Sequence, residues 1–322
     1  MKKSTLVIAA VSMMAAMFTS CTKKSATKKS ADKIPTIGII QLVEHVALDA
    51  NCKGFIDGLA EEGFIDKQTV NIDFQNAQGE QANCVTIAQK FVNNRADLIF
   101  AIATPAAQAA ANLTKKIPIV VSSVTDPESA KLVKSNSMPG TNVTGTSDLT
   151  PCAAQINLLK TLVPDVKNVG MLYCSNEQNS YFQIALAKAE CDKLGISYTD
   201  YTVSSTNEIQ QVVQSAVGKV DAIYSPTDNM IASAMINVSQ VTTPAKIPVI
   251  VGEEGMCANG GLATYGLNYY ELGKQTAKMA AKILRGESEP KDMPIEYLST
   301  CNLTINEEVA KAIGITIPEE LK

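Results

Sequence analysis

The chain has 322 residues, 46% of them hydrophobic and 19% charged, a balance that indicates a folded globular protein and argues against a disordered one. Its formal net charge is −4, and because residues 1–33 contain seven lysines and one aspartate, the rest of the chain carries about −10. A body this acidic repels a phosphate backbone, so nucleic-acid binding is disfavoured.

The N-terminus has a short basic segment followed by an apolar run. Lys2 and Lys3 precede the apolar residues 6–18, and Phe18-Thr19-Ser20-Cys21 then matches a lipoprotein cleavage site. The apolar run is too short to span a bilayer comfortably. We therefore predict a lipoprotein signal peptide over residues 1–20, a lipid such as palmitate on Cys21, and a flexible polar tether over residues 21–33. A plain signal peptide and an uncleaved anchor are the alternatives.

From residue 34 onward, short apolar runs alternate with amphipathic helical patterns, which is typical of a parallel α/β sheet. In the first half, strands are predicted at residues 37–40, 70–74, 98–102 and 119–121. Apolar stripes at helical spacing predict helices over residues 48–59 and 84–92, and Thr104-Pro105 starts a third, alanine-rich helix.

The same order of elements recurs in the second half. Strands are predicted at residues 169–173, 198–202, 222–224 and 249–251, and helices at residues 180–194, 209–217 and after Asp228. Equivalent landmarks keep nearly constant offsets: Gly38 and Gly170 differ by 132 positions, Asp97 and Asp221 by 124, and a Lys-Ile-Pro sequence recurs at an offset of 130. The pattern predicts two similar α/β lobes.

Residues 262–322 hold too few elements for a third lobe. A short apolar strand at 262–265 and a helix at 272–284 are followed by two prolines, a strand at 295–298 and a last short helix. The economical fold is α/β, with two Rossmann-like, doubly wound lobes joined by a hinge. The first lobe would comprise residues 34–147 plus about 262–286, and the second 148–261 plus about 287–322.

Eight cysteines and one histidine restrict the metal and redox chemistry. None of the cysteines forms a C-x-x-C pair, and His45 alone cannot supply a histidine-based zinc site. Seven cysteines remain after Cys21, so complete internal pairing is impossible. We expect small, buried, reduced thiols, although disulfides stay open. No metal or cofactor is predicted.

Polar loops follow the predicted strands in both halves, at the edge where doubly wound sheets bind ligands. They span residues 41–45, 103–105, 122–127, 175–180, 226–229 and 252–255. The first half offers hydroxyls and free backbone N–H groups near Thr104 and Ser123, which attract an anion. The second half offers the carboxylates of Asp228 and Glu253, which attract a cation. Together they predict a zwitterion held between the lobes, unless these side chains only cap helices.

Eight short segments, spread in order along the chain, carry a family resemblance. They are Gln41-Leu-Val-Glu-His45, Asn76-Ala-Gln-Gly79, Ala101-Ile-Ala-Thr-Pro-Ala-Ala-Gln108, Val124-Thr-Asp-Pro127, Asn142-Val-Thr-Gly145, Asn179-Ser180, Pro226-Thr-Asp-Asn229 and Leu262-Ala-Thr-Tyr-Gly266. With them the chain resembles the solute-binding family of ABC transporters that includes bacterial tryptophan- and tyrosine-binding lipoproteins. Val46 departs from the family pattern, in which a proline is expected after the Glu-His pair.

The resemblance implies the two-lobed periplasmic-binding-protein fold of type I and a cleft ligand that is often an aromatic amino acid. It also implies a protein that delivers this ligand to an ABC permease and its ATPase. Together with the predicted lipid on Cys21, it leads us to expect a monomer anchored on the extracytoplasmic face of the cell membrane. The ligand contacts that it implies are Gln41, Glu44, Thr104, Ser123, Asn179, Ser180, Asp228 and Glu253. The loops add four candidates, His45, Thr125, Asp126 and Thr227, with His45 expected in the cleft and not as a base.

Other classes of function have less support. An enzyme would have to build a Ser-His-Asp triad on His45, and the chain has no G-x-S-x-G elbow and no glycine-rich phosphate loop. A sensor that reports its occupancy to a receptor stays open, because lobe closure would be the same event. Another small solute, such as a nucleoside, also stays open.

Overall fold

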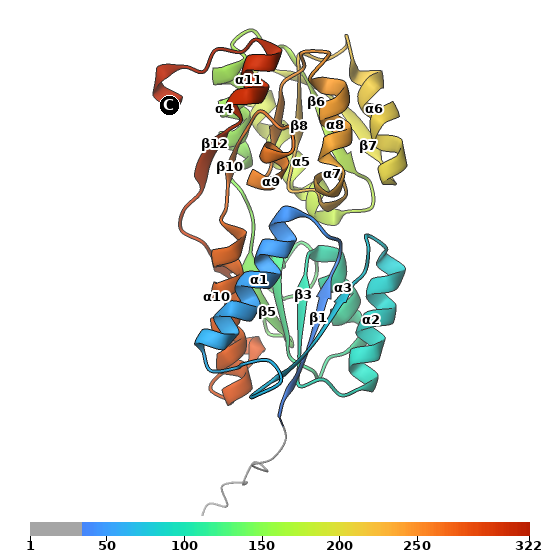
Figure 1. Ribbon diagram of the computed structural model, residues 1–322, viewed down its shortest axis with the longest axis vertical. Helices are drawn as coiled ribbons and strands as arrows, with labels where there is room; N and C mark the ends of the chain where they lie inside the picture. Colours follow the sequence, from blue (N-terminus) through green and yellow to red (C-terminus); the bar gives the residue numbers. More distant parts are fainter. Residues whose placement is uncertain (1–33) are drawn as a thin grey trace, which may run out of the picture. The chain divides into compact units, whose positions relative to one another are not determined.

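Two six-stranded sheets organise residues 34–322, the part of the chain that the computed structural model describes (Figure 1). The predicted signal peptide, Cys21 and the tether lie outside these residues. The first sheet, with the helices that cover it, is lobe 1, and the second is lobe 2. Helices cover the faces of each sheet, and its central strands, such as Leu98–Ile102 and Ala222–Ser225, are buried on both faces.

In lobe 1 the strand order is β11-β5-β4-β3-β1-β2, and all neighbours pair in parallel. The strands are β1 (Thr36–Gln41), β2 (Asn71–Asn76), β3 (Leu98–Ile102), β4 (Ile119–Val124), β5 (Val143–Ser147) and β11 (Glu296–Tyr297). The helices are α1 (Val46–Glu61), α2 (Gln81–Asn93), α3 (Thr104–Leu113) and α10 (Tyr269–Arg285), with a 3-10 turn η2 (Pro290–Asp292).

In lobe 2 the order is β12-β10-β9-β8-β6-β7, and only β12 is antiparallel to its neighbour among the described strands. The strands are β6 (Asn168–Cys174), β7 (Ser197–Val203), β8 (Ala222–Ser225), β9 (Val249–Val251), β10 (Ala263–Gly266) and β12 (Asn302–Ile305). The helices are α4 (Cys152–Leu162), α5 (Gln178–Leu194), α6 (Ile209–Ala216), α7 (Asn229–Ser233), α8 (Met235–Thr242), α9 (Glu254–Ala258) and α11 (Glu307–Ile313), with 3-10 turns η1 (Thr206–Glu208) and η3 (Glu319–Leu321).

The landmarks that repeat in the sequence occupy equivalent places in the two lobes. The order β2-β1-β3-β4-β5 in lobe 1 corresponds to β7-β6-β8-β9-β10 in lobe 2. The Asp97 carboxylate accepts a hydrogen bond from the backbone N–H of Thr36 at 2.9 Å, and the Asp221 carboxylate accepts those of Lys167 and Asn168 at 2.8 Å. Each aspartate therefore ties the start of the third strand to the start of the first. The prediction of two similar α/β lobes is confirmed.

The chain crosses between the lobes three times, and the crossings differ from the predicted boundaries. They lie at residues 148–151 (β5 to α4), 267–268 (β10 to α10) and 298–301 (β11 to β12). The prediction placed 262–286 in lobe 1 and 287–322 in lobe 2, but β10 extends the lobe 2 sheet and β11 the lobe 1 sheet. Leu262 and Ala263 hold β10 in the lobe 2 core, and Ile295 packs beside β11 into the lobe 1 core.

Strand β5 and helix α4 were not predicted. β5 has the sequence Val-Thr-Gly-Thr-Ser, which lacks the apolar run used to recognise strands, yet every residue in it is buried. It is buried because it lies between β4 and β11 inside the sheet. This strand matters for the site, since it leads directly into the first crossing.

Helices α1 and α10 of lobe 1 pack with their backbones in close contact. A Cβ atom on Gly54 would lie 2.0 Å from the carbonyl oxygen of Tyr270, and one on Gly273 would lie 2.1 Å from that of Asn51. Glycine is therefore required at both positions. This contact fixes the relative position of the N-terminal ends of the two helices. Both ends lie at the edge of the lobe 1 sheet that faces lobe 2.

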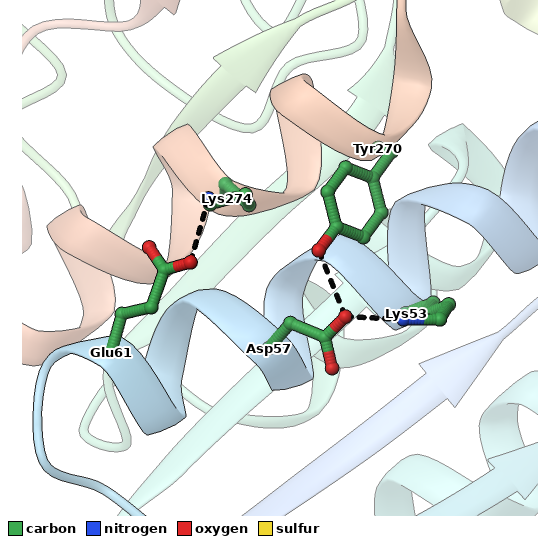
Figure 2. A network of polar contacts seen from close by, with 5 residues as sticks. All are labelled: Lys53, Asp57, Glu61, Tyr270 and Lys274. Carbon is green, nitrogen blue, oxygen red and sulfur yellow. Dashed lines mark hydrogen bonds and ion pairs between the residues drawn. The ribbon is translucent and has the colours of Figure 1, made fainter.

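Charged side chains line the exposed edge of the same helix pair (Figure 2). The Tyr270 hydroxyl donates to Asp57 at 2.9 Å, and Lys53 also pairs with Asp57. Lys274 of α10 pairs with Glu61 of α1 at 2.7 Å. Exposed pairs of this kind contribute about 0–1 kcal/mol each, so the glycine contact decides how these helices dock.

The described residues include no helix that is both long and apolar enough to cross a bilayer. Seven cysteines lie among them and all are free, six buried and Cys301 exposed. Burial raises the pKa of the buried thiols, for example that of Cys52 and Cys174 to about 12, so these groups are unreactive at neutral pH.

Candidate functional site

A small cavity lies where the carboxyl ends of the two sheets meet. Lobe 1 contributes the start of α1 and the end of β4, and lobe 2 contributes the loops after β8 and β9 and the start of α7. The first crossing contributes Asp148, and the start of α10, directly after the second crossing, contributes Tyr269. The lining side chains are His45, Leu48, Ser123, Asp148, Thr227, Asp228, Asn229, Ala232, Glu253 and Tyr269. The enclosed space is about 10 Å³, roughly the room for one water molecule. A larger ligand can enter only when the lobes or the lining side chains move apart.

A second, larger cavity of about 610 Å³ lies beside the first and is also lined by both lobes. The two cavities share Asn229. The His45 Nε2 atom lies 3.4 Å from the Asn229 Oδ1 atom, which accepts a hydrogen bond when the ring proton is on Nε2. The contact between these two side chains therefore stands at the boundary between the cavities.

Neutral amide side chains take part in the hydrogen bonds that join the two lobes. Gln178 of α5 accepts from the Gln108 side chain at 2.8 Å and donates to the Ser129 carbonyl oxygen at 2.6 Å. Two further hydrogen bonds run from Gln183 to Thr125 and from Gln81 to the Asn176 carbonyl oxygen. The lobes are thus closed upon each other. Because a neutral hydrogen bond contributes about 0.5–1.5 kcal/mol net, such contacts permit reopening.

Several buried polar atoms around the cavity have no hydrogen-bond partner of ordinary geometry. On its walls these are His45 Nδ1, Ser123 Oγ and Asp148 Oδ1, and close by are Thr104 Oγ1 and Asn179 Oδ1. A buried polar group left unpaired costs about 1–3 kcal/mol, and native proteins retain few of them. These atoms, which come from both lobes and from a crossing, can therefore bind the polar groups of a ligand.

The backbone is strained at the ends of two lobe 1 strands. Ala103, after β3, has φ 80° and ψ 153°, and Ser123, in β4, has φ 54°. Non-glycine residues rarely adopt these conformations, and such strain concentrates at binding sites. The strained backbone turns the Ser123 side chain towards the cavity. It also places the first turn of α3 at the edge of lobe 1 that borders the cleft.

The cavity is electrostatically negative. Asp148, Asp228 and Glu253 line it, and no lysine or arginine of residues 34–322 does. Burial raises the pKa of Asp148 to about 6 and that of Glu253 to about 7, and it also raises the pKa of Asp228. Burial lowers the pKa of His45 to about 4, so the imidazole is neutral at pH 7. The shifts follow from burial, which no lysine or arginine on the cavity lining offsets.

Five of the twelve predicted site residues line the cavity: His45, Ser123, Thr227, Asp228 and Glu253. Four others are buried nearby. The Thr104 hydroxyl is unpaired, Thr125 accepts from Gln183, Asn179 donates to the Thr227 carbonyl oxygen at 3.2 Å, and Ser180 donates to Asp228 at 2.6 Å.

Three predicted residues do not face the cavity. The Gln41 side chain is buried against Asp49, to which it donates at 2.6 Å. Glu44 is exposed. Asp126 accepts hydrogen bonds from the Ser129 N–H at 2.6 Å and the Asn136 amide at 2.8 Å, so it organises its own loop. Each has a polar side chain in a loop at the predicted edge of the sheet, but none of the three lines the cavity.

The predicted division of charge also needs correction. Asp228 accepts from the backbone N–H groups of Cys174 (2.6 Å) and Ile231 (2.9 Å) and from the Ser180 hydroxyl. Glu253 accepts from the N–H groups of Gly255 and Met256, both at 2.6 Å. Both carboxylates therefore act as helix caps, the alternative that the sequence left open.

Sequence reasoning missed five lining residues: Leu48, Asp148, Asn229, Ala232 and Tyr269. Leu48 and Ala232 lie three positions after the predicted loops 41–45 and 226–229, and Asn229 is the last residue of the second loop; all three lie in the first turns of helices. Asp148 and Tyr269 lie at the crossings, which cannot be located without β5 and the true place of β10. The Asn229 position was visible in the Pro226-Thr-Asp-Asn229 segment.

Known proteins that are similar to this chain point to the same class of function. A family model described as "ABC transporter substrate binding protein" matches residues 36–322. The tyrosine-binding protein of Clostridioides difficile is 41% identical over 317 residues, which cover 96% of this chain and 91% of that protein.

Solved structures agree in fold. The ABC domain from Streptococcus pneumonia in complex with L-Trp is 42% identical, with a TM-score of 0.87 over 90% of this chain and 97% of that one. The ligand-free, open structure of a substrate-binding protein with adhesive properties from Clostridium difficile is 45% identical, with a TM-score of 0.68 over 89% and 97%. The higher score against the L-Trp complex, at similar identity, fits the closed lobes described above. The predicted type I periplasmic-binding-protein fold is confirmed.

Proposed function

The chain belongs to the ABC transporter substrate-binding protein family, and we propose that its ligand is a zwitterionic aromatic amino acid held between the two lobes. Membership makes it an extracytoplasmic protein that captures a small molecule for an ABC permease. The family match covers almost the whole of the described chain. The predicted class of function is therefore confirmed, and the ligand is the part that we propose.

The observation that carries the proposal is the set of unpaired buried polar atoms on the walls of the small cavity. His45 Nδ1 and Ser123 Oγ come from lobe 1, and Asp148 Oδ1 comes from a crossing. A ligand with both donors and acceptors satisfies them, and it can do so only when the lobes are closed around it. Three carboxyl groups without a lysine or arginine favour a ligand that carries a positive charge.

The ligand's carboxylate has a complementary place in lobe 1. The α3 helix begins at Thr104, whose hydroxyl is buried and unpaired, and a helix N-terminus of this length attracts anions. Ser123 adds a second hydroxyl. The aromatic side chain is supported by the relatives, one named for tyrosine and one crystallised with L-Trp.

Hinge closure is the mechanism that we propose for capture and release. A ligand that touches both lobes stabilises the closed form and shifts the population towards it, without any covalent step. The permease then distinguishes the closed form from the open one. We propose that the ligand leaves unchanged, which chromatography of the ligand after prolonged incubation would test.

A ligand panel tests the proposal. We expect L-tyrosine, L-tryptophan and L-phenylalanine, each at about 100 times its Kd, to stabilise the protein by roughly 2.7 kcal/mol, an increase in Tm of about 5–10 °C. Adenosine, a sugar and L-leucine serve as comparisons. Because the chain contains no tryptophan, a change in the fluorescence of added L-tryptophan reports its binding without a contribution from protein tryptophan. Stabilisation by adenosine or the sugar, and by none of the amino acids, would contradict the proposal.

We further propose that a lipid on Cys21 keeps a monomeric protein near its permease, which raises the local concentration. The support is the sequence Phe18-Thr19-Ser20-Cys21 after a basic and apolar segment. Replacing Cys21 with serine should move the protein from the membrane fraction to the soluble fraction. Unchanged membrane fractionation of that variant would argue against the lipid.

A further inference from the structure

Asp148 and Tyr269 lie at two different crossings between the lobes and contact each other in the cavity. Asp148 is the first residue after β5, and Tyr269 is the first residue of α10. The Tyr269 hydroxyl donates to Asp148 Oδ2 at 2.8 Å, and Tyr269 and Asp148 are 6% and 4% exposed, respectively. Both side chains line the small cavity.

The three carboxyl groups on the cavity differ in how many of their acceptor sites are already used. Asp228 has a hydrogen bond to each oxygen and a further one from Ser180, and Glu253 has one backbone N–H on each oxygen. On Asp148 the Tyr269 hydroxyl donates to Oδ2, the Thr125 side chain also interacts with the carboxylate, and Oδ1 has no hydrogen-bond partner of ordinary geometry. Asp148 is therefore the one of these three carboxyl groups with an oxygen that accepts no hydrogen bond of ordinary geometry, although one acceptor site on each Glu253 oxygen is also unused.

A buried carboxylate with a free oxygen and no cation beside it is unfavourable in the ligand-free closed form. Burial raises the pKa of Asp148 to about 6, and hydrogen bonds from the Tyr269 and Thr125 side chains oppose that rise. An ammonium group placed against Oδ1 removes this penalty and forms a charge-assisted hydrogen bond. The neutral His45 imidazole and the Ser123 hydroxyl on the same walls cannot supply such a charge.

We infer that Asp148 is the counter-ion of the ligand's amino group and that Tyr269 is the residue that positions the Asp148 carboxylate for it. This assignment rests on the proposed function and names the group within that site that makes it selective for amino acids. It replaces the assignment of the ammonium group to Asp228 and Glu253.

The surroundings of Tyr269 support a positioning role. The Asn51 side chain of α1 donates to the Tyr269 carbonyl oxygen at 3.3 Å and to the Ser122 hydroxyl of β4 at 2.8 Å. The close contact of α1 and α10 at Gly273 holds the same end of α10. The backbone of Tyr269 is thus held in place, which fixes the direction of its hydroxyl. Asp148, by contrast, lies on a crossing that must bend when the lobes open.

Two probes that differ only in the amino group test the assignment. L-tyrosine and 3-(4-hydroxyphenyl)propanoate are titrated calorimetrically into the wild-type protein, Asp148→Asn and Tyr269→Phe. Asparagine keeps the shape and an acceptor for Tyr269 but removes the charge. Asp126→Asn is the matched control, because its carboxylate serves a loop away from the cavity.

We expect the wild-type protein to prefer L-tyrosine by about 100-fold. Asp148→Asn should lose most of that preference, weakening L-tyrosine by about 100-fold and the deaminated probe by less than about threefold. Tyr269→Phe should reduce the preference by about tenfold, again mainly by weakening the binding of L-tyrosine. A merely structural defect would weaken the binding of both probes alike. Asp126→Asn should match the wild-type protein.

Equal losses for both probes in Asp148→Asn would overturn the assignment and make Asp148 a structural residue. A wild-type protein that binds the two probes equally well would also overturn it. The first result leaves the proposed function standing, whereas the second leaves capture of an aromatic carboxylate standing but removes recognition of the ammonium group. Binding of neither probe by a folded wild-type protein would instead overturn the proposed function and this assignment together.

Discussion

Replacing Gly54 with alanine should destabilise the protein by about 3 kcal/mol or more, although alanine is the better helix former by about 1 kcal/mol. The added Cβ would lie 2.0 Å from the Tyr270 carbonyl oxygen and 2.8 Å from its carbonyl carbon. Backbone atoms cannot rotate away as a side chain can, so α1 and α10 would have to separate. Urea unfolding monitored by circular dichroism measures the loss.

Lys53→Ala is the matched control, since Lys53 is the neighbouring residue of α1 and its exposed side chain pairs with Asp57 (Figure 2). It should change the free energy of unfolding by less than about 1 kcal/mol. If Gly54→Ala were as stable as the wild-type protein, the close backbone contact between the helices would be wrong. Ligand binding should weaken together with stability in Gly54→Ala, because α1 and α10 carry Leu48 and Tyr269 into the cavity.

Replacing Asp228 with alanine should destabilise the ligand-free protein by at least about 3 kcal/mol. The substitution leaves the N–H groups of Cys174 and Ile231 and the Ser180 hydroxyl buried without an acceptor. These groups join the end of β6, the start of α5 and the start of α7, so three segments of lobe 2 lose a common anchor. Thermal and urea unfolding without ligand measure the effect.

Asp126→Ala provides the comparison, because that aspartate also caps a loop but is only partly buried; its loss should cost about 1 kcal/mol. The sequence alone predicts a different result for Asp228→Ala, namely lost binding with an intact fold. A variant with wild-type stability and no affinity for amino acids would restore the ammonium-binding role of Asp228 and remove its role as a helix cap.

The fold was accessible from the sequence because it is repeated and because most strands are apolar. Buried runs such as residues 98–102 and 249–251 mark strands without any help from tertiary structure. β5 was not predicted because a strand inside a sheet can consist of threonine, serine and glycine when its neighbours supply the apolar cover. Once β5 is missed, the first crossing and Asp148 are missed with it.

The site was only partly accessible for a physical reason that Asp228 and Glu253 illustrate. A carboxylate just before a helix has the same sequence pattern whether it caps the helix or binds a ligand. The difference lies in whether its oxygens are already occupied, which depends on residues far away in the chain such as Cys174 and Ser180. By contrast, His45 and Ser123 were found because the loop after a parallel strand reaches the cleft in nearly every doubly wound sheet.

The most direct test of two lobes that close on a solute is a distance across the cleft. Donor and acceptor dyes are attached to cysteines placed at the exposed Gln89 of α2 and Gln211 of α6, with Cys21 and the exposed Cys301 changed to serine. We predict that L-tyrosine raises the energy transfer between the dyes to a new plateau and that 3-(4-hydroxyphenyl)propanoate does so far less. A transfer efficiency that stays the same at saturating L-tyrosine, while calorimetry shows binding, would contradict capture by lobe closure.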